Sequence, residues 1–179
     1  MHSKFRSHEE QLTYDDVLLV PRKTSVRSRQ DVDLSVNLGT TKMKYPIMSA
    51  AMDTVTDYRM AQAVGNIGGI GIIHRFQNVR DRMTSAQSIS AQVGIAVGLD
   101  ETKADSLSLS AFCDVIALDV AHAHADYVIE RTKELSGWLS NWGGQLMVGN
   151  LVTREATWEL IEAGADILKV GIGGGSACS

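Results

Sequence analysis

Short apolar runs recur along the chain from residue 46 onward, and longer amphipathic stretches separate them. Each run is continuous rather than alternating, and Gly, Asp or Pro bounds it. Runs of this kind are typical of strands in a parallel sheet that is buried on both faces, and they are too short for buried helices. The sequence therefore predicts six strands, within Pro46–Ala50, Gly69–Ile73, Val93–Val97, Cys113–Asp119, Gln145–Asn150 and Asp166–Gly171.

The stretches between these runs carry apolar residues at helical spacing. One helix is predicted over Tyr58–Val64, and a second over Tyr127–Leu135 that ends near Gly137. A third is predicted to begin after Thr153 as its N-cap. The apolar face of this third helix is predicted to hold Trp158, Leu160 and Ile161. Residues 1–45, in contrast, are polar and irregular.

Two strand entries resemble each other, which indicates a repeated βα unit. Cys113-Asp114-Val115 and Ala165-Asp166-Ile167 both place a small residue, an acid and then apolar residues directly after a predicted helix. Six strands separated by helices fit either a doubly wound sheet or a (β/α)₈ barrel, and the regular spacing of the runs slightly favours the barrel. Because six units cannot close an eight-stranded barrel, we expect the polypeptide to continue past Ser179 by two more units.

Composition narrows the class of protein. The 179 residues carry a net charge of −4 without a basic run, so neither a nucleic acid nor an anionic membrane is an expected partner. No apolar stretch is long enough to span a membrane, and the first residues do not form a signal peptide. The only cysteines are Cys113 and Cys178, which excludes a disulfide framework and predicts a cytoplasmic location.

The densest candidate chemistry is the glycine-rich run Gly171–Ser179, which follows the last predicted strand. Its backbone N–H groups suit an anion, although a hinge or linker would have the same composition. Cys178 within it is either a thiolate nucleophile in an environment rich in N–H donors or an incidental cysteine. Cys113 lies in an apolar run and is predicted to be part of the core.

Other candidates follow the predicted strands, where the active sites of barrels are built. Ser49–Thr54 follows the first run, Asp119 ends the fourth and Asn150 ends the fifth. His122 and His124 lie just after Asp119, but no third ligand at a typical spacing accompanies them, so a metal site is not favoured.

Six segments together resemble the IMP dehydrogenase/GMP reductase family, in family order. They are Leu12–Pro21, Ser49–Val55, Gly68–His74, Leu118–His122, Gly149-Asn150 and Lys169–Cys178. The resemblance implies a (β/α)₈ TIM barrel of which this chain holds about the first six strands. It also implies an N-terminal extension of residues 1–45 packing on the barrel, and a single barrel domain from residue 46 to residue 179. The last two strands, a flap and a further catalytic residue would then follow Ser179.

The resemblance also implies the roles of individual residues. Cys178 resembles the nucleophile that attacks C2 of the purine, and Asp119 and Asn150 resemble groups that line the cofactor space. The implied substrate-binding residues are Ser49, Met52, Asn150, Gly175 and Ser176. The backbone carbonyls of Gly173, Gly175 and Cys178 match positions that hold a monovalent cation, K⁺, in the dehydrogenases.

Within the family, two features favour GMP reductase, which converts GMP and NADPH to IMP, ammonia and NADP⁺. Only Arg75–Gln92 joins the second and third strands, which leaves no room for the regulatory CBS pair of the dehydrogenases, and Ser28–Leu34 resembles the reductases. Ser49–Met52 and Ala121-His122 instead resemble the dehydrogenases, so NAD-dependent oxidation of IMP to XMP is the alternative. Arg75 departs from the lysine that is common at its position, so no role is carried over to it.

The resemblance further implies NADPH or NAD as cofactor, GMP or IMP as the small-molecule partner, and a homotetramer or higher homo-oligomer. A non-catalytic barrel fragment is the remaining alternative, because a barrel that lacks two strands exposes its sheet edges.

Overall fold

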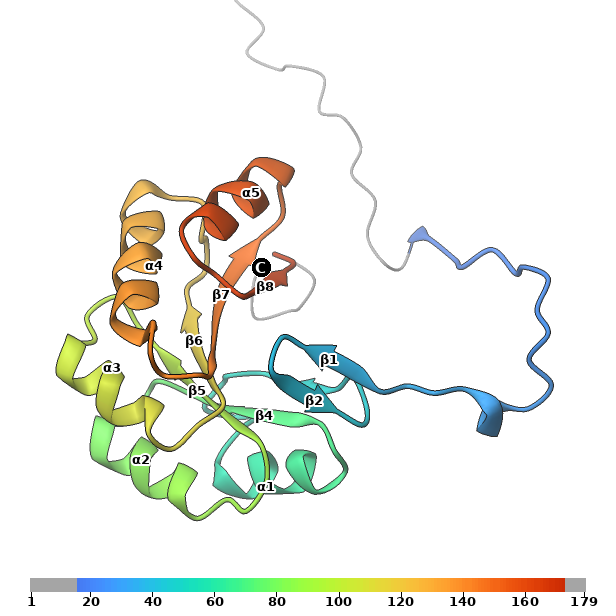
Figure 1. The fold of residues 1–179 in the computed structure, drawn as a ribbon, viewed down its shortest axis with the longest axis horizontal. Helices are drawn as coiled ribbons and strands as arrows, with labels where there is room; N and C mark the ends of the chain where they lie inside the picture. Colours follow the sequence, from blue (N-terminus) through green and yellow to red (C-terminus); the bar gives the residue numbers. More distant parts are fainter. Residues whose placement is uncertain (1–15, 173–179) are drawn as a thin grey trace, which may run out of the picture. The chain divides into compact units, whose positions relative to one another are not determined.

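In the computed structural model, which describes residues 16–172, six parallel strands form one curled sheet (Figure 1). The strands are β3 (Met48–Ser49), β4 (Ile70–Ile73), β5 (Val93–Val97), β6 (Val115–Asp119), β7 (Gln145–Leu151) and β8 (Ile167–Val170). Their order across the sheet follows their order along the chain, and all neighbours pair in parallel. The six apolar runs are these six strands, with bounds that differ by at most two residues. The prediction of a (β/α) barrel with about its first six strands is confirmed.

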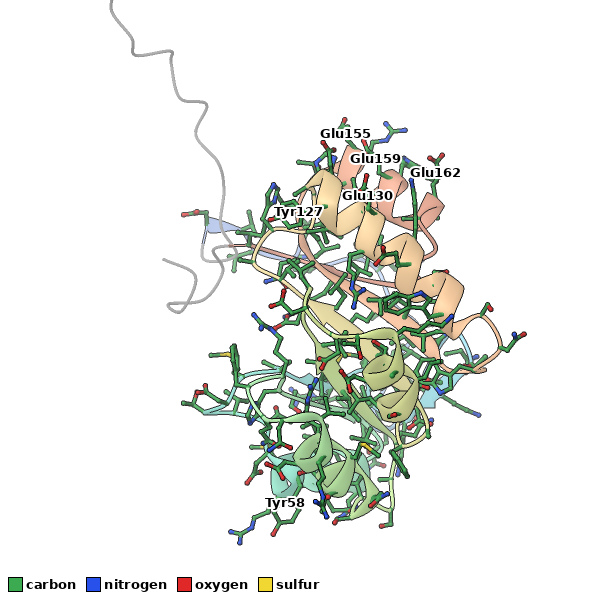
Figure 2. All side chains as sticks on the ribbon, turned by 90° about the vertical axis from the view of Figure 1, so that its left-hand side faces the viewer. Tyr58, Tyr127, Glu130, Glu155, Glu159 and Glu162 are labelled. Atoms are coloured by element: carbon green, nitrogen blue, oxygen red, sulfur yellow. The ribbon has the colours of Figure 1, made fainter. Side chains whose placement is uncertain are left out.

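Five helices connect successive strands of the sheet and form an arc along its convex side (Figure 1). They are α1 (Tyr58–Asn66), α2 (Val79–Gln87), α3 (Lys103–Ser110), α4 (Asp126–Leu139) and α5 (Arg154–Glu162). The glutamates labelled on α4 and α5 in Figure 2 lie on the outside of this layer. No helix within residues 16–172 combines the length and the apolar character that crossing a membrane requires.

Four of the helices begin at a side chain that accepts a hydrogen bond from the backbone N–H three residues later, which satisfies one of the free donors at a helix start. These N-cap residues are Asp57, Asn78, Thr102 and Thr153. The predicted cap at Thr153 is therefore present, with its hydroxyl 3.2 Å from the Ala156 nitrogen.

One detail of the helix predictions is wrong. Only Leu160 of the predicted apolar face on α5 is buried, because it shares its side of the helix with Ala156, whereas Trp158 and Ile161 are exposed. Helix α4 ends at Leu139, two residues past Gly137, so its predicted end near Gly137 is confirmed; the buried Leu139 side chain packs on the core.

Two apolar layers cover the two faces of the sheet, which explains the continuous rather than alternating strand sequences. The outer layer lies between strands and helices and includes Val93, Ile95, Ile116, Leu118, Leu146 and Val148. The inner layer lines the concave face and includes Ile70, Ile72, Ala96, Val115, Ala117, Met147 and Ile167. Odd and even positions of a strand therefore point to different layers, except in β7 after Gly149, where the register shifts and Leu151 belongs to the outer layer. This alternation decides which side chains can reach the barrel interior.

An antiparallel hairpin of β1 (Val36–Leu38) and β2 (Thr41–Met43) precedes the sheet, within residues that the sequence indicated to be irregular. Its turn contains Gly39 at φ +60°, a conformation that favours glycine. Met43 joins the inner layer, and Gly39 lies against the Gln145 side chain at the start of β7, so the hairpin covers the amino ends of the strands. Strands of three residues are too short to give a period-2 signal, so the pattern did not predict them.

Asp114 and Asp166, which precede β6 and β8 in the two similar segments, have the same structural role. Asp114 Oδ2 accepts the backbone N–H of Val93 at 2.9 Å, and Asp166 Oδ2 accepts that of Leu146 at 2.8 Å. Each carboxylate thus ties the start of one strand to its neighbour. The resemblance between the two segments has a structural basis.

Residues 33–172 form one compact unit, and residues 16–32 are described separately. Within the latter, a short 3₁₀ helix over Arg29–Asp31 begins at Ser28, whose hydroxyl accepts the Gln30 N–H. The packing of residues 1–45 on the barrel stays a prediction.

A buried ion pair joins α2 to the loop after β5. Arg82 is 3% exposed, and both ends of its guanidinium contact the Glu101 carboxylate at 2.8 Å while one also donates to the Ala96 carbonyl. Arg131 on α4 donates to the Glu101 backbone carbonyl and, at 3.0 Å, to the exposed carboxylate of Glu134. Glu101 is therefore the point at which α2 and α4 meet the same loop.

We predict that Glu101→Ala lowers the free energy of unfolding by about 3–5 kcal/mol, because it leaves the Arg82 charge buried and unpaired. Glu134→Ala also removes a carboxylate bonded to a buried arginine, but Glu134 is 57% exposed, so a loss below about 1 kcal/mol is expected. Urea unfolding followed by circular dichroism measures both. Equal losses would contradict the importance of the buried pair.

Candidate active site

The carboxyl ends of the strands surround a cavity of about 240 Å³ on the concave face. Its lining, called the mouth cavity below, consists of Met48, Ser49, Ala50, Ala51, Ile72, Ala117, Asp119, Met147 and Lys169. The wall is apolar apart from Ser49, Asp119 and Lys169. A cavity with an apolar wall and a few polar groups at its rim is the usual form of a small-molecule site.

An acid and an amine from two different strands meet at the rim of this cavity. Asp119 ends β6 and Lys169 lies in β8, and the Lys169 Nζ is 3.2 Å from the Asp119 Oδ1. Both side chains are partly exposed, so the pair contributes little to stability and both charges face the cavity entrance.

The pair depends on a glycine in the strand between the two charges. In the sheet register, Asp119 lies opposite Gly149 of β7, and Gly149 lies opposite Lys169. A Cβ atom on Gly149 would be 2.5 Å from the Lys169 Cβ and 2.9 Å from its backbone oxygen. The missing side chain therefore leaves the space in which Lys169 reaches across β7 to Asp119.

Asn150, the next residue of β7, has a fixed backbone and an amide oxygen without a partner. Its N–H donates to the Val120 carbonyl and its own carbonyl accepts the Ala123 N–H, both at 2.7 Å. The peptide bond between Gly149 and Asn150 is cis. The Oδ1 atom is buried and makes no hydrogen bond within the described residues. A buried acceptor left free in this way is typical of a ligand site.

Ser49 and Met52 belong to β3 and the turn after it. The Ser49 Oγ is also buried without a hydrogen-bond partner in the described part of the chain. The turn is held by the Thr56 hydroxyl, which donates to the Ala50 carbonyl, and by the Thr56 N–H, which donates to the Met52 carbonyl. Met52 is 38% exposed and does not line the mouth cavity.

The structure therefore brings two of the predicted site residues, Ser49 and Asp119, to one cavity, and places Asn150 directly after the glycine of its rim. Lys169 is a polar residue of the same rim to which the sequence analysis gave no role. In the sequence, Lys169 stands out as a lysine within an apolar strand. Its position along that strand is one that points a side chain to the inner layer. Gly173, Gly175, Ser176 and Cys178 lie outside the described residues.

Two other candidates lie away from the mouth cavity. Cys113 packs against the core, as predicted; its thiol donates to the Leu109 carbonyl, and burial raises its pKa far above the ordinary value. His124 lies 3.5 Å from Glu159, and no group of three metal-binding side chains occurs within residues 16–172.

A half-barrel with polar side chains at the carboxyl ends of its strands has the arrangement in which (β/α) barrels build their active sites. Comparison with known proteins shows the family to which the chain belongs. The model of the IMP dehydrogenase / GMP reductase domain matches residues 11–179. The chain belongs to the IMP dehydrogenase/GMP reductase family, a family of oxidoreductases in purine metabolism.

Individual relatives carry both names at similar identity. The inosine-5′-monophosphate dehydrogenase of Cryptosporidium parvum is 35% identical over 94% of this chain and 53% of its own length. The GMP reductase of Lactobacillus gasseri is 36% identical over 94% of this chain and 52% of its own length. The crystal structure of inosine 5′-monophosphate dehydrogenase from Legionella pneumophila is similar with a TM-score of 0.84 and 37% identity, over 93% of this chain and 52% of that one. The chain thus spans about half the length of these relatives.

We predict that Gly149→Ala lowers the free energy of unfolding by about 1–3 kcal/mol, because the new methyl group overlaps the backbone of Lys169. Gly137→Ala is the matched control, since nothing lies within 4 Å of a Cβ there and α4 gains roughly 0.5–1 kcal/mol from the better helix former. Urea unfolding of both variants tests this. If the stability of Gly149→Ala is unchanged, the residues Asp119, Gly149 and Lys169, which lie opposite one another across β6, β7 and β8, are not tightly packed.

Proposed function

We propose that this chain contributes to a purine nucleotide oxidoreductase that acts at C2 through a cysteine adduct, in the direction of GMP reductase. The reaction takes GMP, NADPH and a proton to IMP, ammonia and NADP⁺. The observation that carries the proposal is the mouth cavity. It combines an apolar wall with the Asp119–Lys169 pair and a buried Ser49 oxygen that has no partner within the described residues, in a chain that belongs to this family.

In this proposal the Cys178 thiolate adds to C2 of the purine, and the amino group takes up a proton and leaves that carbon as ammonia. After hydride has been transferred to C2, the C2–S bond breaks, which releases IMP and restores the thiolate. Gly175 and Ser176 bind the phosphate through N–H and hydroxyl donors. Ser49 and Met52 bind the nucleotide at the opposite strand end. Holding the base in this orientation converts the addition into an intramolecular step.

Asn150 and Asp119 are the proposed contacts of the nicotinamide nucleotide. The free Oδ1 of Asn150 fits an N–H donor such as a carboxamide, and Asp119 fits a hydroxyl or amide donor beside it. When bound, the nicotinamide nucleotide supplies the hydride for C2.

Two observations favour the reductase direction. The matches to the dehydrogenases of Cryptosporidium parvum and Borreliella burgdorferi run over 215 and 227 positions, more than the 179 residues of this chain, so those relatives carry inserted residues that it lacks. The match to the reductase of Lactobacillus gasseri runs over 177 positions. Helix α2 and its short flanks are all that joins β4 to β5.

IMP dehydrogenase is the second candidate, with IMP, NAD⁺ and water giving XMP and NADH. This candidate is supported by two segments that resemble the dehydrogenases, Ser49–Met52 and Ala121-His122. It is also supported by the likeness to the Legionella pneumophila enzyme. Three expectations also stay predictions: a K⁺ ion on the carbonyls of Gly173, Gly175 and Cys178, a homotetramer, and a cytoplasmic location.

We predict that Cys178→Ala lowers kcat by more than about 100-fold while the melting temperature stays near that of the wild type, because the variant lacks a required nucleophile and Cys178 belongs to a glycine-rich segment of the sequence rather than to an apolar run. Cys113→Ala is the control. It removes a buried thiol from the core, so it should cost about 1 kcal/mol of stability and leave kcat nearly unchanged. Steady-state assays and thermal unfolding of the full-length protein separate the two effects. A Cys178→Ala variant that keeps more than about one-hundredth of the wild-type kcat would exclude covalent catalysis.

The direction of the reaction is tested by absorbance at 340 nm on the full-length protein. We expect NADPH to be consumed in the presence of GMP, and little NADH to form from IMP, NAD⁺ and K⁺. Robust NADH formation from IMP without GMP-dependent loss of NADPH would assign the dehydrogenase reaction instead. Activity in neither assay would leave the family intact and overturn the proposed function.

A further inference from the structure

Two adjoining cavities lie at the amino ends of the strands, the end of the sheet opposite the mouth cavity. Their volumes are about 290 Å³ and 330 Å³, and both are lined by Thr40 of the hairpin and by the turn Trp142–Gly144 before β7. Asp166 lines the first and Asp114 lines the second. We call them the amino-end cavities.

The amino-end cavities carry negative charge that no cation of the described chain neutralises. Asp114 and Asp166 each accept one backbone N–H through Oδ2, which leaves the other carboxylate oxygen available. No ion pair involves either carboxylate, and neither Lys, Arg nor His lines the cavities among residues 16–172. An anionic ligand is therefore disfavoured, and a cation is favoured.

A buried amide adds an unused acceptor to the same place. Gln145 lines the first cavity, its side chain is 94% buried (6% exposed), and its Oε1 makes no hydrogen bond within the described residues. The hairpin turn at Gly39 lies directly against this amide, since a Cβ there would come within 2.3 Å of Oε1. The hairpin therefore holds in place an acceptor that lacks a donor, which is a costly arrangement without a ligand or water.

An aromatic ring lies where the two cavities adjoin. Trp142 is half-buried and lines both, and Gly144 provides the space for its indole, because a Cβ there would be 2.4 Å from the ring. The face of an indole attracts a positive charge that lies over it. A metal ion is not favoured, because no group of three metal-binding side chains occurs in the described chain.

We propose that the amino-end cavities bind an organic cation that carries N–H donors, a guanidinium or primary ammonium group. The cation donates to Asp166, Asp114 or the Gln145 oxygen and lies against the Trp142 ring. Its source is either a free alkylamine or the basic side chain of a second copy of this chain, which present the same chemistry. The proposal does not depend on the proposed function, and its test does not use activity.

The first arm of the experiment is calorimetry of the full chain with agmatine and 1,4-diaminobutane, and with 1,4-butanediol as the neutral analogue. We expect the two cations to bind and the diol not to bind. Asp166→Asn keeps an oxygen for the Leu146 N–H and removes the charge, so affinity should fall at least about tenfold. Glu130→Gln removes an equal charge from the exposed face of α4 (Figure 2) and should leave affinity unchanged.

Tryptophan fluorescence provides a readout that does not require Asp166→Asn to fold. Agmatine should change the emission of the wild type, and this change should be absent in Trp142→Phe although Trp138 and Trp158 remain. An emission change that persists in Trp142→Phe would place the cation elsewhere and overturn the proposal.

The second arm distinguishes the two sources by sedimentation velocity over a range of protein concentrations. If the cation belongs to a second copy, the wild type should self-associate, and agmatine or Asp166→Asn should shift it toward smaller species. If the source is a free amine, association should not respond to either. The proposal is overturned if neither cation binds more tightly than the diol and self-association does not depend on Asp166.

Discussion

Parallel pairing of consecutive strands is the constraint on which the rest of this structure depends. After each strand, the chain must return to the amino end of the sheet before the next parallel strand can begin. Every connection therefore carries a helix, and the carboxyl ends of all strands meet at one rim. The mouth cavity is a direct consequence, because Ser49, Asp119 and Lys169 come from three strands that are far apart in sequence. A single antiparallel strand in the sheet would have placed its polar end at the opposite rim.

The two ends of the sheet differ in what their polar groups do. At the amino ends, the carboxylates of Asp114 and Asp166 are bonded to the backbone of the neighbouring strand, and they hold strand starts together. At the carboxyl ends, the side-chain oxygens of Ser49 and Asn150 make no hydrogen bond to any residue between 16 and 172. The strand-joining hydrogen bonds of these carboxylates thus lie at the amino ends, whereas the mouth cavity lies at the carboxyl ends, where barrels build their active sites.

Much of the fold could be predicted from the sequence, because strands buried on both faces give continuous apolar runs and caps such as Thr153 give helix starts. The hairpin could not be predicted, since three-residue strands carry no periodic signal. The exposure of Trp158 and Ile161 depends on which side of α5 packs on the sheet, which only the three-dimensional structure supplies. In the site, Ser49, Asp119 and Asn150 follow from their place after strands. Lys169 requires the strand parity and the register with Gly149, which only the three-dimensional pairing supplies.

The row formed by Asp119, Gly149 and Lys169 has a consequence for how β7 finds its place in the sheet. If β7 slipped by one residue, Val148 or Asn150 would stand between the carboxylate and the ammonium, and the apolar side chains of the strand would exchange faces. The charges could then no longer meet across the strand. Gly149 therefore favours one register of β7, because the charges of Asp119 and Lys169 can meet only when β7 is aligned correctly.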